Sequence, residues 1–196
     1  MKSLIITGAT GMIGSAIVEQ AVAQGYFCTC IVRKETKRRS NIQVSSLVNI
    51  VECNINEYAS IKEEIHGDVF IHLAWEKPFG NERDNVDLQL KNVNYTLDAV
   101  RFAKKCGCSV FIGAGSQAEY GVQAVDLTPE LPVQPESGYG IAKYTAGKLS
   151  KMLCQQLGIR FNWLRILSVY GQKDNSYTLI SYVINELKNA GAEAIS

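Results

Sequence analysis

A tyrosine and a lysine four residues apart form a chemically suggestive pair in this chain. Tyr139 and Lys143 stand in the stretch YGIAK, at the start of a segment with helical spacing, where residues i and i+4 share a face. A free tyrosine has a pKa of about 10, but a nearby ammonium stabilises the phenolate and lowers that pKa. The pair therefore predicts proton exchange between Tyr139 and a substrate hydroxyl or carbonyl. A surface contact between two helical neighbours is the alternative, since Y-x-x-x-K is common by chance.

A serine could complete this pair. Ser116 follows the apolar run SVFIGAG, which is typical of a buried strand, and its hydroxyl could orient the same substrate oxygen. Residues 116–137 show no clear period and contain three of the four prolines. Long irregular loops in compact domains are usually functional or disordered, so we expect this segment to line a site.

A glycine-rich turn near the N-terminus suits a dinucleotide. The first apolar run continues into TGATGMIG and then into a helical segment. Glycines at this place permit a tight turn and close approach to a pyrophosphate, which the helix N-terminus attracts. A plain turn is the alternative interpretation. We assign cofactor binding here to Gly8, Thr10, Gly11, Met12, Ile13 and Gly14.

The end of the second apolar run favours NADP over NAD, although NAD remains open. NAD-binding folds usually place an acidic residue there, and this run ends in Ile31, Val32, Arg33 and Lys34. A guanidinium matches phosphate geometry, so Arg33, with Lys34 beside it, is assigned to the 2′-phosphate. The cations that follow are interpreted as a solvated surface loop: Lys37, Arg38 and Arg39.

Short apolar runs alternate with longer helical segments along the whole chain. This alternation predicts an α/β fold, a doubly wound parallel sheet of the Rossmann type. The expected strands are Ser3–Thr7, Tyr26–Arg33, Leu47–Cys53, Asp68–Ala74, Ser109–Ala114 and Arg160–Val169. The expected helices are Met12–Gln24, Glu57–Ile65, Asp84–Lys105, Gly138–Leu157 and Tyr177–Asn189.

Composition excludes several classes of function. The net charge is +1, so no overall field favours nucleic acid, and no apolar run reaches the length of a membrane span. The apolar stretch after the N-terminus is too short for a signal peptide, so we expect a cytoplasmic protein. The six cysteines lack metal-ligand spacing and are interpreted as buried thiols, and we expect no metal site.

Taken together, the motifs resemble the extended short-chain dehydrogenase/reductase superfamily, the branch of nucleotide-sugar epimerases, dehydratases and reductases. TGATGMIG, DVFIHLAW, NVNYTLDAV, GAGSQAEYG, PESGYGIAK and LRILSVYGQ resemble its motifs in their usual order, over essentially the whole chain. The departures from the usual residues are Tyr95, Ser168 and Gln172.

The resemblance implies roles for particular residues. Ser116, Tyr139 and Lys143 correspond to the catalytic triad, and Lys143 also to the residue that holds the nicotinamide ribose. It implies a nucleotide-sugar substrate and a possible homodimer, formed through the segment 84–105 and the helix of Tyr139. Further cofactor contacts implied by matching are Asn54 with Ile55 near the adenine, and Leu73, Ala74 and Asn92. Asn54 and Asn92 also have purely structural interpretations, as the end of a strand and as a cap.

The residues after Ser116 bear on the reaction. The sugar 4,6-dehydratases of the family carry Asp-Glu there, whereas this chain has Gln117 and Ala118, with Glu119 one place later and expected to point elsewhere. We therefore expect an epimerase or a reductase. The alternatives are a cofactor-binding regulatory module without catalysis and a reductase of small carbonyl compounds. We expect a cofactor domain over residues 1–172 and the start of a truncated C-terminal substrate region over 173–196, the lobe itself being largely absent.

Overall fold

A parallel sheet forms the centre of the computed structural model, which describes residues 2–176 and 178–193. Its strands are β1 (Ser3–Thr7), β2 (Phe27–Val32), β3 (Val48–Glu52), β4 (Val69–His72), β5 (Val110–Ser116) and β6 (Arg160–Ile166). They lie in the order β3-β2-β1-β4-β5-β6, and every neighbouring pair is parallel. The predicted fold class, a doubly wound Rossmann-type sheet, is confirmed.

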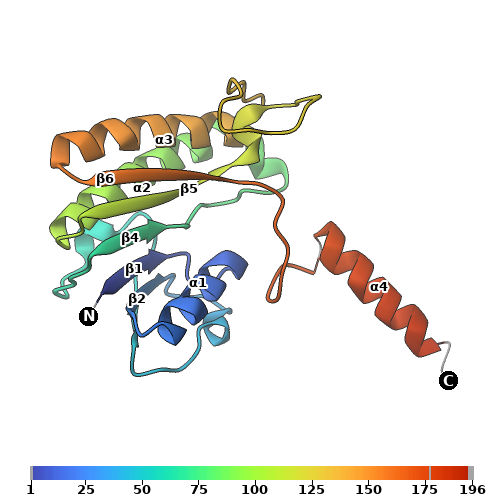
Figure 1. Ribbon diagram of the computed structural model, residues 1–196, viewed down its shortest axis with the longest axis horizontal. Coiled ribbons are helices and arrows are strands. Elements are labelled where there is room, and N and C mark those ends of the chain that lie inside the picture. The colour runs from blue at the N-terminus through green and yellow to red at the C-terminus, as the bar shows by residue number, and fades with distance from the viewer. Residues whose placement is uncertain (1, 177, 194–196) are drawn as a thin grey trace.

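Helices cover both faces of the sheet (Figure 1). Helix α1 (Met12–Ala23) lies on one face, and α2 (Val86–Lys105) and α3 (Gly138–Leu157) lie together on the other. The side chains of Asn85 and Ser137 cap α2 and α3 by accepting amide hydrogen bonds, each of 3.1 Å. Such caps fix where a helix begins, and here they fix the start of the helix that carries Tyr139.

The last helix lies apart from the sheet. Helix α4 (Leu179–Glu193) follows an extended segment and stands away from the sheet layers in Figure 1. Its apolar side chains are largely exposed, with Leu179 at 74% and Leu187 at 68%. Among the described residues, no helix combines the length and apolarity that a membrane crossing requires.

The packing of the sheet explains why its strands are almost continuously apolar. One core cluster joins Phe70 and Phe111 of the central strands to Phe102 of α2, with the two strand rings stacked at 5.7 Å. The other joins Ile6 and Cys30 to Val18 of α1. Because both faces are covered, neither face of β1 or β4 needs polar residues.

One predicted helix is wrong. Residues 57–65 contain only a 3₁₀ turn, Tyr58–Ser60, followed by irregular chain. Tyr58, Ile61 and Ile65 are all buried, and the Tyr58 ring stacks on Phe102 at 5.9 Å. The Ile61 carbonyl accepts a hydrogen bond from the Lys105 ammonium, 3.3 Å away. In a helix this carbonyl would accept from a main-chain amide instead. Tertiary burial thus outweighs the helical spacing of the two isoleucines.

The ends of two strands and the start of one helix near the predicted site also differ from the prediction. β5 runs on to Ser116, so this serine is the last residue of the strand, and β6 ends at Ile166. The expected helix start at Asp84 belongs to a separate 3₁₀ turn, Asn81–Asp84. The expected start of the last helix, Tyr177, lies outside the described residues.

Candidate active site

A cavity of about 930 Å³ opens at the carboxyl edge of the sheet. The strand order reverses between β1 and β4, and in open α/β sheets ligands bind at this reversal. The cavity extends from the turn after β1 to the end of β5 and the start of α3. Of the predicted site residues, it is lined by Gly8, Gly11, Met12, Ile13, Gly14, Leu73, Ser116, Tyr139 and Lys143.

The turn after β1 fits a dinucleotide phosphate. Gly8 has a φ of 71°, a conformation that favours glycine, and a Cβ on it would lie 2.9 Å from the Ala74 nitrogen. Gly14 packs against Gly8, leaving no room for a side chain. Helix α1 has no side-chain cap at Gly11 and no acidic residue in its first turn. Its first amides therefore remain available to an anion, as a pyrophosphate requires.

Ser116 and Tyr139 meet at the other end of the cavity. The Ser116 hydroxyl accepts a hydrogen bond from the Ala118 amide, 3.2 Å away. Burial raises the pKa of Tyr139, while a hydrogen bond with Ser116 and the charge of Arg83 oppose that rise. Our expectation of a lowered pKa is therefore wrong for this structure, in which burial outweighs the favourable charges.

The position of Lys143 explains this difference. Its ammonium donates to the Ala114 carbonyl at 2.7 Å and lies 3.8 Å from the centre of the Trp75 ring. It is 5.7 Å from the centre of the Tyr139 ring. Lys143 is only 4% exposed, and burial lowers its pKa to about 7, against an opposing effect of Glu119. The ammonium is thus directed at Ala114 and Trp75, and burial dominates the pKa of Tyr139.

Among the cavity residues that the sequence analysis did not assign, Trp75 and Arg83 both contact Tyr139. Trp75 contacts Tyr139 edge to face at 5.8 Å, and Arg83 lies 4.8 Å above the same ring. Trp75 lies in the chain directly after β4 and Arg83 in the 3₁₀ turn Asn81–Asp84, and this region has no sequence periodicity that would place them. The one signal was the aromatic residue at the end of HLAW, directly after a buried strand.

The basic segment after β2 is arranged differently from the prediction. Arg33 is exposed and outside the cavity lining, and Lys34 forms an exposed ion pair with Glu57 at 2.8 Å. Arg38, which we had interpreted as a surface residue, lines the cavity and donates to Asn175. A turn in which the Thr36 amide donates to the Arg33 carbonyl carries the chain back toward the site.

The remaining predicted cofactor residues lie outside the cavity lining. Asn92 is fully buried and clamps the backbone of Glu76, accepting from its amide at 2.9 Å and donating to its carbonyl at 3.0 Å. Ala74 donates its amide to the Thr7 hydroxyl, and the Thr10 carbonyl accepts from Asn41. The last two predicted cofactor residues, Asn54 and Ile55, follow β3. Ile55 is buried in the hydrophobic core, and Asn54 is half-buried.

Comparisons with known proteins agree with this geometry. The model of the NAD dependent epimerase/dehydratase family matches residues 4–195. A putative UDP-glucose 4-epimerase of Methanocaldococcus jannaschii is 27% identical over 179 residues, 88% of this chain and 57% of the relative. A crystal structure of UDP-galactose 4-epimerase has a TM-score of 0.79 at 24% identity, over 95% of this chain and 63% of that chain.

A further solved structure shares the fold. UDP-glucuronic acid 4-epimerase from Bacillus cereus, in complex with NAD, has a TM-score of 0.79 at 20% identity, over 95% of this chain and 64% of that chain. The chain thus spans between 57% and 64% of the length of these relatives.

Proposed function

The chain belongs to the NAD-dependent epimerase/dehydratase family, and on that premise we propose that it is an epimerase or reductase of a nucleotide-activated sugar. One observation carries the proposal. Ser116, Tyr139 and Lys143 line the same cavity as the glycine turn after β1, so a proton-transfer group and a phosphate cradle face one ligand. The nucleotide-sugar class is taken from relatives such as the UDP-glucose 4-epimerases.

The residues of the cavity fit a nicotinamide dinucleotide. Gly8, Gly11 and the first amides of α1 would hold its pyrophosphate, and Lys143 would hold the nicotinamide ribose. The chemistry that the nicotinamide supplies when bound is hydride transfer at a sugar ring carbon. We propose NADP as the preferred cofactor and NAD as the second.

The chain's own residues would move the proton. Tyr139 would exchange its phenolic proton with the sugar oxygen, and the Ser116 hydroxyl would hold that oxygen in place. Water loss would need a further acid and base beside the serine. Gln117 and Ala118 stand there, and the Glu119 carboxylate is buried away from the cavity. This arrangement supports an epimerase or reductase over a dehydratase.

We also propose an organisation for the chain. Residues 1–172 would bind the cofactor, and residues 173–196 would begin a substrate-binding region, in keeping with the exposed apolar side chains of α4. A homodimer through α2 and α3 is supported by their exposed Leu90 and Met152. The six free, buried thiols suit a cytoplasmic protein.

Cofactor preference provides a prediction about Arg38. Replacement of Arg38 by alanine is expected to weaken NADPH binding about tenfold and NADH binding less than twofold, because one guanidinium–phosphate contact is lost. Parallel calorimetric titrations with the two cofactors measure the difference. Arg33→Ala should have a smaller effect, since Arg33 lies outside the cavity lining, and Lys37→Ala serves as a charge-matched control. Equal losses for the two cofactors would contradict a role in 2′-phosphate binding.

The proposed substrate class is tested by ligand-induced stabilisation and turnover. A nucleotide sugar that binds the folded chain raises its melting temperature by mass action. UDP-, GDP- and dTDP-sugars are screened with the cofactor bound, and each one that stabilises is assayed for conversion. Stabilisation and conversion by a small aldehyde, with none by any nucleotide sugar, would favour the reductase of small carbonyl compounds.

A further inference from the structure

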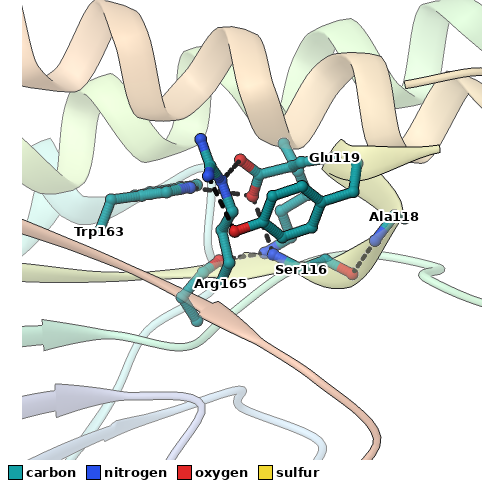
Figure 2. A network of polar contacts seen from close by, with 8 residues as sticks. Ser116, Ala118, Glu119, Trp163 and Arg165 are labelled. Atoms are coloured by element: carbon teal, nitrogen blue, oxygen red, sulfur yellow. Dashed lines mark hydrogen bonds and ion pairs between the residues drawn. The ribbon is translucent and has the colours of Figure 1, made fainter. Parts of the chain in front are cut away.

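A buried carboxylate lies directly behind the proposed catalytic serine. Glu119 is 1% exposed and belongs to the 3₁₀ turn Gln117–Tyr120, which follows β5. Its Oε1 accepts from the Ser116 amide at 2.8 Å and from the Trp163 indole nitrogen at 2.9 Å, and its Oε2 faces the Arg165 Nε at 3.2 Å (Figure 2). Three donors thus satisfy a carboxylate that would otherwise be costly to bury.

The serine is held at two points. Its amide donates to Glu119, and its hydroxyl accepts from the Ala118 amide, so Ser116 caps the turn that contains Glu119. This reciprocal arrangement is a capping box, which fixes the start of a helical turn. Because the hydroxyl oxygen already accepts from Ala118, its own proton is left to be donated into the cavity, toward Tyr139 or a substrate oxygen.

Arg165 anchors the carboxylate from the neighbouring strand. Gly115 and Ser116 pair in register with Arg165 and Ile166, so the guanidinium of β6 lies beside the end of β5. Arg165 also donates to the Tyr120 hydroxyl at 3.0 Å, so it contacts the last two residues of the turn. A Cβ at position 115 would overlap the Glu119 carboxylate, so the strand leaves space for that group.

We propose that Glu119, ion-paired to Arg165, is a positioning residue that holds the backbone of Ser116 and so directs the serine hydroxyl toward Tyr139. The proposal rests on the proposed function, in which Ser116 orients the sugar oxygen. Glu119 does not line the cavity, so it acts through the serine and without contact to the ligand. Its hydrogen bonds are charge-assisted and therefore stronger than a neutral acceptor would provide.

The first test follows the Ser116 amide and needs no turnover. Glu119→Gln keeps the shape of the side chain and removes its charge. We expect hydrogen exchange at the Ser116 amide, measured by NMR, to become about tenfold faster, because a charge-assisted hydrogen bond becomes a neutral one. Glu130→Gln, an exposed change in the following loop, is the matched control and should leave this amide unchanged. An unaltered Ser116 amide in Glu119→Gln would overturn the proposal.

The second test is a double-mutant cycle on turnover. Glu119→Gln is expected to lower kcat about tenfold, with KM and the cofactor Kd within twofold of the wild type. In the Ser116→Ala background the same change should have almost no effect, because no hydroxyl remains to be positioned. An equal loss in both backgrounds would show that Glu119 does not act through the serine hydroxyl and would overturn the proposal.

The two tests separate the possible failures. If the wild-type chain converts no nucleotide sugar, the proposed function fails, and the amide measurement still decides whether Glu119 holds Ser116. If the wild type is active and the Ser116 amide does not respond, the positioning role alone fails.

Discussion

Replacement of Tyr139 by phenylalanine is expected to lower kcat about 10³-fold, within the range that a positioned acid–base group contributes. The change removes one oxygen and keeps the ring that packs against Trp75 and beneath Arg83. Cofactor affinity should stay within twofold, because the cradle of Gly8–Gly14 is at the other end of the cavity. Steady-state kinetics on a substrate from the nucleotide-sugar screen and calorimetry with the cofactor give the two values.

A matched control comes from the same helix. Tyr144 belongs to α3 but is outside the cavity lining, so Tyr144→Phe should leave kcat within twofold of the wild type. Turnover retained in Tyr139→Phe would remove the proton-transfer role from this residue and the mechanism proposed for the site.

Replacement of Lys143 by methionine is expected to have opposite effects on activity and stability. Turnover should fall at least 10²-fold, since the ammonium that would hold the nicotinamide ribose is lost. The free energy of unfolding should rise by about 2 kcal/mol at pH 6, because methionine fills the space without a buried charge. The loss of the hydrogen bond to Ala114 and of the contact with Trp75 offsets part of that gain. Urea unfolding of the two proteins measures the difference.

The gain in stability should depend on pH in a defined direction. Burial lowers the pKa of Lys143 from its ordinary 10.5 to about 7 in the folded chain. Below pH 7 the lysine is protonated in both states, so the cost of burying its charge is fully present. Between pH 7 and 10.5 the folded chain releases the proton while the unfolded chain keeps it, and wild-type stability rises. The advantage of Lys143→Met should therefore shrink over this window.

The neighbouring titratable groups do not obscure the pH dependence that we expect from Lys143 between pH 7 and 10.5. Burial lowers the pKa of His72 to about 3, so this group titrates below the window. Burial raises the pKa of Tyr139 above its ordinary value of 10.0, and this tyrosine is present in both proteins. A constant stability difference between the two proteins from pH 6 to 10 would show that Lys143 is not held in the low-dielectric setting described for it.

The sheet and the main parts of the site were predictable because their signals are local. A run such as VFIHL is apolar enough to identify a strand covered on both faces, and a glycine triplet between a strand and a helix identifies a phosphate turn. Parallel strands end at one edge of the sheet, which is why Ser116 and the turn after β1 can reach one ligand. The structure brings them to one cavity.

The features that the sequence did not predict depend on contacts between residues that are far apart in the sequence. The spacing of Ile61 and Ile65 favours a helix, and only the packing of α2 against Tyr58 shows why none forms. The path of the chain after Thr36 decides that Arg38 rather than Arg33 lines the cavity. The orientation expected for Glu119, away from the ligand, agrees with its burial, but its partners on β6 are 44 and 46 residues away. No local pattern connects them.

The most direct test of the account is a calorimetric titration of the chain with NADPH and NADH in parallel, repeated on a Gly14→Val variant. We expect the wild type to bind both cofactors and to prefer NADPH. The variant should bind neither, because Gly14 packs against Gly8 with no space for a side chain. Absence of binding to the wild type, or equal binding by a folded variant, would contradict the central claim that the cavity is a dinucleotide site.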